Sequence, residues 1–160
     1  MASTPFTTCL WFDGAAEAAA DYYLSVFKDG ERGRVGLYPE GSPGVAGEVM
    51  VVEFEINGQK FVGLNGGPQF PFTEAVSFQI HCADDAEADY YYEALTADGG
   101  QESACGWVKD KFGLSWQVIP AGAIELISDP DPGRAARATA AMMKMKKLDV
   151  AEMRRAADEG

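Results

Sequence analysis

The sequence has few of the residues that build disulfide frameworks or metal centres. It contains one histidine and three cysteines, Cys9, Cys82 and Cys105, which form no C-x-x-C pair and no Cys/His spacing typical of zinc. No apolar run approaches the roughly 20 residues that cross a bilayer, and the N-terminus does not resemble a secretory signal. We therefore expect a soluble, reduced, cytoplasmic protein with no membrane partner.

Basic residues are also scarce. The chain has 13 Lys and Arg against 25 Asp and Glu, so its formal net charge is −12. This charge repels phosphate backbones and anionic lipids. The only basic run lies near the C-terminus, at residues 144–155, among helix-forming residues. We therefore expect no nucleic-acid partner.

What the sequence does contain is a repeated pattern. A β-rich segment, 8–14, runs into an alanine-rich helix at 15–27, and the alternating segment 77–82 runs into a second helix at 86–95, for which Asp84 offers an N-cap. Both helices contain Asp-Tyr-Tyr. Each helix is followed by a β-hairpin: 49–56 and 59–64 around Asn57-Gly58, then 106–112 and 114–119 around Gly113.

This order predicts an α+β fold made of two βαβββ modules. Because a sheet with one helix cannot bury both of its faces, we expect the two sheets to curve around a shared cleft, the default ligand site. The expected parts of this single domain are a first module at 1–65, a connector at 66–73, a second module at 74–128 and a helical tail at 129–160.

The tail should hold a helix from about 133 to 147 and a shorter one capped by Asp149. It carries a stripe of methionines. Two interpretations stay open for this stripe: packing against the body or a second subunit, or a regulatory interaction helix.

Four segments make the chain similar to one known family: 10–14 (LWFDG), 65–68 (NGGP), 105–117 (CGWVKDKFGLSWQ) and 145–149 (MKKLD). In these the chain resembles the PhnB-like group, labelled 3-demethylubiquinone-9 3-methyltransferase-like, of the vicinal oxygen chelate superfamily. That superfamily includes glyoxalase I, extradiol dioxygenases and bleomycin-resistance proteins. The resemblance implies a glyoxalase/bleomycin-resistance fold and a homodimer, whose modules can be exchanged between subunits.

The resemblance also implies where a metal would bind. Metal-dependent members use one cleft-facing side chain from the first and last strand of each module, which here gives Thr8, Val62, Ser77 and Gln117. A divalent ion needs stronger donors, such as carboxylate or imidazole, to replace its hydration. We therefore expect no metal and no cofactor. The methyltransferase label is disfavoured, because no strand is followed by a glycine-rich turn that opens a helix, as in a doubly wound methyltransferase.

Alternation along the strands predicts which residues line the cleft. The expected lining is Thr8, Leu10, Phe12, Val62, Leu64, Gln79, His81, Gln117 and Ile119. The residues expected to pack under the helices are Cys9, Trp11, Phe78, Ile80, Cys82, Trp116 and Val118. His81 can be a solvated cleft residue, a general base or a metal ligand, and Cys105 a nucleophile or a half-buried structural residue.

This mostly apolar lining favours the binding of a small apolar or aromatic molecule without a metal. The alternatives are a divergent glyoxalase-type lyase or isomerase that uses His81 or Cys105, and the methyltransferase of the family label. Whether the protein is an enzyme is left open by the sequence.

Overall fold

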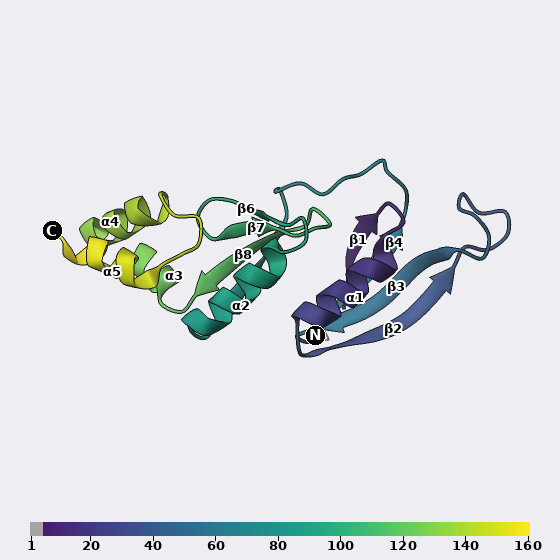
Figure 1. Ribbon diagram of the computed structural model, residues 1–160, viewed down its shortest axis with the longest axis horizontal. Coiled ribbons are helices and arrows are strands. Elements are labelled where there is room, and N and C mark those ends of the chain that lie inside the picture. The colour runs from purple at the N-terminus through teal and green to yellow at the C-terminus, as the bar shows by residue number, and fades with distance from the viewer. Residues whose placement is uncertain (1–4) are drawn as a thin grey trace. The chain divides into compact units, whose positions relative to one another are not determined.

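The computed structural model describes residues 5–160 (Figure 1). The chain divides after Phe72 into two compact units, and each is described by itself. The first unit contains β1 (Thr8–Phe12), α1 (Ala16–Val26), β2 (Gly30–Leu37), β3 (Val49–Ile56) and β4 (Gln59–Asn65). The second contains β5 (Ser77–Cys82), α2 (Asp85–Thr96), β6 (Gln101–Glu102), β7 (Trp107–Lys109), β8 (Ser115–Pro120), α3 (Ala123–Ile127), α4 (Pro132–Met142) and α5 (Val150–Asp158).

The two sheets have the same topology. Their strand orders are β1-β4-β3-β2 and β5-β8-β7-β6. In each, the first strand runs parallel to the last, and the other described pairs are antiparallel. The α+β fold of paired βαβββ modules with extra C-terminal helices is therefore confirmed. The cleft shared by the two modules stays a prediction.

The first unit packs α1 on one face of its sheet. Tyr23 of α1 stacks on Phe54 with ring centroids 6.0 Å apart, and Phe54 stacks on Phe61 at 5.3 Å. The hairpin of β3 and β4 lies where the sequence predicted it. The edge strand β2, whose place the sequence did not indicate, is held to α1 by Arg32, which bridges Glu17 and Asp21 at 2.5 Å each.

The second unit packs α2 on its sheet, and the Asp84 carboxylate accepts a hydrogen bond from Glu87 N at 2.8 Å, which confirms the predicted N-cap. Strand β7 ends at Lys109, three residues before the predicted end, and β8 begins one residue later than predicted, because Asp110 and Gly113 close the turn between them.

Three helices, α3, α4 and α5, form a cluster of their own in the C-terminal part. Met153, Ala138 and Ala157 are fully buried in it. Helix α4 ends at Met142, five residues before the predicted end, and α3 was not predicted. The tail is tied to the β-module by Cys105 N, which donates to Met145 O at 2.8 Å, and by the Lys147–Asp89 ion pair. Within residues 5–160, no helix has the length and apolar character that crossing a bilayer requires.

Candidate functional site

Each sheet has one face under its own helix and a second face, here called the open face. In the first unit the open face carries alternate residues of the strands: Cys9, Trp11, Glu31, Val51, Glu53, Glu55, Lys60, Val62 and Leu64. In the second unit it carries Ser77, Gln79, His81, Trp107, Lys109, Ser115, Gln117 and Ile119. Each open face is a candidate site by itself, since a helix already covers the other face of each sheet.

Strand β1 presents the opposite face to the one predicted. Leu10 and Phe12 are 5% and 4% exposed and lie on the helix side. Leu10 pairs with Gly63, where an added Cβ would stand 3.2 Å from Ala16 Cβ in α1. Thr8 shares that side, because it pairs with the buried Phe61. Successive side chains of a strand point to opposite faces of the sheet. A shift of one residue in the connection between β1 and α1 therefore moves every β1 side chain to the other face.

Consequently Cys9 and Trp11, which the sequence placed under the helix, lie on the open face with Val62 and Leu64. Trp11 is partly covered by the connector. Its indole Nε1 donates to Gly67 O at 2.8 Å, and its ring meets Phe70 edge-on at 4.9 Å.

Alternation in the second unit matches the prediction. Gln79, His81 and Gln117 share the open face, while five residues lie on the helix side: Phe78, Ile80, Cys82, Trp116 and Val118. Ile119 points to the same side as Gln117 but is only 7% exposed, because it packs into the C-terminal helix cluster.

A chain of hydrogen bonds crosses this open face. Gln117 Nε2 donates to Ser77 Oγ at 2.8 Å, and Gln79 Nε2 donates to Gln117 Oε1 at 3.3 Å. Trp107 pairs with Gln117 on its other side. Both the oxygen and the nitrogen of the Gln117 amide are therefore engaged in hydrogen bonds. Ser77, Gln117 and Gln79 form a fixed, uncharged, polar row beside the aromatic ring, here called the amide row.

The fold family implies a divalent metal, and these residues do not fit one. Ser77 and Gln117 are tied to each other, and Gln117 Oε1, the best donor oxygen of the pair, already accepts a hydrogen bond. On the first unit the corresponding open-face pair is Cys9 and Val62. Within the described part of the chain, no three His, Cys, Asp or Glu residues are grouped so that they could hold a metal ion.

The two weak catalytic candidates are His81 on β5 and Cys105 in the turn before β7, and the contacts described for them include no carboxylate. His81 is exposed, and the register places Ile119 beside it on β8. Cys105 Sγ lies 3.6 Å from the thioether sulfur of Met143, which cannot act as a general base. Their roles in chemistry stay predictions.

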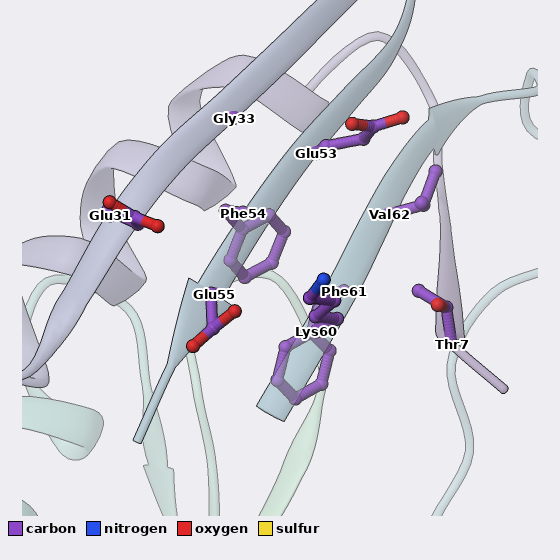
Figure 2. A pocket seen from close by; sticks show the side chains of 9 residues that line it. All are labelled: Thr7, Glu31, Gly33, Glu53, Phe54, Glu55, Lys60, Phe61 and Val62. Carbon is purple, nitrogen blue, oxygen red and sulfur yellow. The ribbon is translucent and has the colours of Figure 1, made fainter. Parts of the chain in front are cut away.

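The sequence did not predict the acidic hollow on the open face of the first unit. Figure 2 shows Glu31, Glu53 and Glu55 set along β2 and β3, with Lys60 on β4. The hollow has a volume of about 350 Å³ and is lined by Thr7, Glu31, Gly33, Glu53, Phe54, Glu55, Lys60, Phe61 and Val62. Glu31 stands opposite Glu55, a like-charge pair whose repulsion Lys60, the other neighbour of Glu55, offsets. The Glu53-x-Glu55 alternation was a visible signal, but Glu31 lies on the strand that the sequence did not locate.

Two of the segments that carry the resemblance, 65–68 and 105–117, hold neighbouring parts of the fold in place. Asn65 Oδ1 accepts a hydrogen bond from Ala16 N at 2.9 Å at the start of α1, and Asn65 Nδ2 donates to Val49 O at 3.0 Å. Gly66 must be glycine, since a Cβ there would lie 2.3 Å from the Trp11 ring.

In the segment 105–117, the carboxylate of Asp110 is 2% exposed. It accepts hydrogen bonds from Phe112 N, Leu114 N and Trp116 Nε1 at 2.9, 3.1 and 2.9 Å. The same segment sends Lys109, Ser115 and Gln117 to the open face.

Burial shifts two further groups in the second unit. It raises the pKa of the Cys82 thiol to about 11, helped by the nearby Glu87 carboxylate, and the pKa of Tyr92 to about 12, helped by its hydrogen bond to Glu102. Both groups therefore stay protonated at neutral pH, and both lie away from the open face, as residues that pack with α2.

Comparisons with known proteins agree with this architecture. No curated protein has a significantly similar sequence. A solved PhnB protein from Bacillus cereus, described as a 3-demethylubiquinone-9 3-methyltransferase, is 32% identical with a TM-score of 0.63 over 71% of this chain and 97% of that one.

Two more distant structures show the fold alone. Protein PA1353 from Pseudomonas aeruginosa is 20% identical with a TM-score of 0.56, over 71% of this chain and 95% of that chain. The fosfomycin resistance protein FosX from Mesorhizobium loti is 13% identical with a TM-score of 0.54, over 76% and 94%. The family model for 3-demethylubiquinone-9 3-methyltransferase matches residues 4–119. The chain therefore belongs to that family, the PhnB-like group of the vicinal oxygen chelate superfamily.

Proposed function

We propose that this protein binds a small organic molecule against the open face of the sheet in its second unit, and that it does so without a metal ion. The observation that carries the proposal is the Gln117 amide, held between Ser77 and Gln79 at a position where a metal-dependent relative would need a free donor. A neutral amide row suits hydrogen bonding to a ligand, and it offers little to a divalent cation.

The surrounding side chains favour an apolar or aromatic ligand. Trp107 flanks Gln117 on β7, so an aromatic ring lies beside the amide on the open face of the second unit. Aromatic rings and branched aliphatic side chains supply contact area, and one or two amides fix orientation. The row formed by Ser77, Gln79 and Gln117 carries no charge that would stabilise a charged transition state, so binding there is favoured over catalysis.

The family name describes methyl transfer, and the topology does not support it here. Most methyltransferases hold their methyl donor on a doubly wound parallel sheet. Both sheets of this chain have one parallel and two antiparallel pairings.

Native mass spectrometry of gently purified protein tests the proposal. We expect the wild type to carry a small organic adduct. Gln117→Ala should lose it, because the substitution removes the central amide of the hydrogen-bonded row on the second unit. Gln59→Ala is the matched control, since Gln59 is exposed at the start of β4 and should keep the adduct. Retention of the adduct by Gln117→Ala, or turnover of a hemithioacetal by the wild type, would overturn the proposal.

We also propose that the protein is a cytoplasmic homodimer. The sheets end in the edge strands β1 and β2 in one unit and β5 and β6 in the other, and such edges are commonly covered by pairing about a two-fold axis. The three cysteines are all free thiols, as a reducing compartment would keep them. Sedimentation velocity should give the mass of two chains, and a monomer at micromolar concentration would contradict the pairing.

A further inference from the structure

Ser115 is a buried polar side chain whose hydrogen-bonding capacity is unused. It is 2% exposed, and its Oγ has no hydrogen-bond partner. Burying a hydroxyl without a partner destabilises the folded state. A strand position that keeps a buried hydroxyl without a partner lowers the stability of the fold. Such a position is a candidate for a ligand contact, because functional sites are where residues of this kind are found.

The position of Ser115 in the sheet shows what such a ligand would meet. Ser115 pairs with Ser77 on β5 and with Lys109 on β7, so it lies between them on the open face. It also lies two residues from Gln117 on β8, and therefore on the same face as the amide row.

Lys109 carries the positive charge next to Ser115. Its Nζ forms an ion pair with Glu74 Oε1 at 2.5 Å, and this contact lowers the pKa of the Glu74 carboxyl. Glu74 precedes β5, Lys109 belongs to β7, and β8 lies between these two strands in the sheet. The ion pair therefore joins chain segments on both sides of β8, at the level of Ser115. Glu74 is 63% exposed, and an ion pair exposed to this degree is weak, so another anion can replace its carboxylate on Lys109.

We propose that Lys109 and Ser115 form an oxyanion site on the open face of the second unit, in which a carboxylate or phosphoryl group of the ligand replaces Glu74 on Lys109 and accepts a hydrogen bond from Ser115 Oγ. A cation beside a hydroxyl donor matches an anionic oxygen acceptor. This inference rests on the proposed function and adds the ligand class: an apolar or aromatic body that would lie toward Trp107 and Gln117, with one anionic end.

Binding of two probes tests the site. Inorganic phosphate and benzoate are titrated into ¹⁵N-labelled full-length protein, and dissociation constants are taken from the amide shifts of β7 and β8. Tighter binding of benzoate than of phosphate identifies a carboxylate ligand, and the reverse order a phosphoryl ligand. Either order supports the site, and binding of neither probe near β7 and β8 overturns it.

The variants separate a binding role from a structural one. Lys109→Gln and Ser115→Ala should each weaken probe binding roughly tenfold or more, since each removes a hydrogen bond to a charged group. Glu74→Gln should tighten it about two- to fivefold, because Lys109 loses its competitor. Ser115→Ala should also raise Tm by about 3 °C or more, since the unpartnered hydroxyl is gone.

Lys60→Gln is the matched control, because Lys60 is a lysine on the sheet of the first unit, beside Glu55, and the variant should bind the probes like the wild type. If Ser115→Ala lowers Tm and leaves probe binding unchanged, the hydroxyl is structural and the inference is wrong. In that case, loss of the organic adduct by Gln117→Ala would leave the proposed function standing. Loss of probe binding in Lys109→Gln and Ser115→Ala with an adduct retained by Gln117→Ala would instead overturn the proposed function.

Discussion

Replacing Asp110 should destabilise the second unit more than any surface change. The Asp110 carboxylate is 2% exposed and accepts three hydrogen bonds, two of them from donors in the buried residues Leu114 and Trp116. In Asp110→Ala these two donors lose their partner at roughly 1–3 kcal/mol each, and the turn at Gly113 loses its anchor. We expect the free energy of unfolding to fall by about 3–5 kcal/mol.

Thermal and urea unfolding measure this loss. For a chain of this size each kcal/mol shifts Tm by about 2–4 °C, so Asp110→Ala should melt roughly 6–20 °C lower. Asp110→Asn keeps one acceptor oxygen but turns an amide NH₂ toward a donor, and should lose less, about 1–3 kcal/mol. Asp13→Ala, at an exposed aspartate, is the control. A loss below about 1 kcal/mol in Asp110→Ala would show that the buried donors are satisfied without the carboxylate.

Three further predictions concern other parts of the fold. Asn65→Ala should cost roughly 2–4 kcal/mol in urea unfolding, since it removes the bonds to Ala16 N and Val49 O, and Asn65→Asp should recover the part due to Ala16. A comparable loss in both variants would contradict this assignment. Gly66→Ala should displace the Trp11 ring, seen as a change in near-ultraviolet circular dichroism, while Gly41→Ala, where a Cβ has open space, should leave the Trp11 signal unaltered. The buried Cys82 thiol has its pKa raised to about 11, so its contribution to stability is complete below the pKa of the unfolded thiol, near 9, and is lost as the pH rises through 11. The wild type should therefore lose up to roughly 2 kcal/mol more than Cys82→Ala between pH 9 and 11, and equal losses would show that the thiol is not responsible.

The sequence predicted most of the architecture because the modules repeat. The alternation in 77–82, the Asn57-Gly58 turn and the Asp84 cap are local signals, and the structure follows each. The edge strand β2 was not located because its residues are exposed and rich in glycine and charge, so it lacks an alternating pattern.

The faces of the strands were predicted correctly in the second unit and in β4 of the first, but not in β1. In the second unit the large residues Phe78, Trp116 and Val118 mark the helix side clearly. In β1 both faces carry large apolar residues, Leu10 and Phe12 on one and Trp11 on the other, so the pattern does not fix the face. The packing of Ala16 against Gly63 settles it, and no local rule reveals that contact.

The burial of Ser115 and its pairing with Lys109 were also beyond the sequence, because they depend on the register between β7 and β8. A serine in an alternating strand is ordinarily a solvent-facing residue. Only the tertiary structure shows that this one is enclosed and has no partner.

The absence of a metal site can be checked by elemental analysis after equilibration with one equivalent of Mn²⁺, Ni²⁺ or Zn²⁺ and dialysis. We expect no retained ion, because Gln117, Ser77, Cys9 and Val62 supply one thiol and no carboxylate or imidazole, too few strong donors to replace the hydration of a divalent ion. One ion retained per chain by the wild type and lost in Gln117→Ala would contradict it.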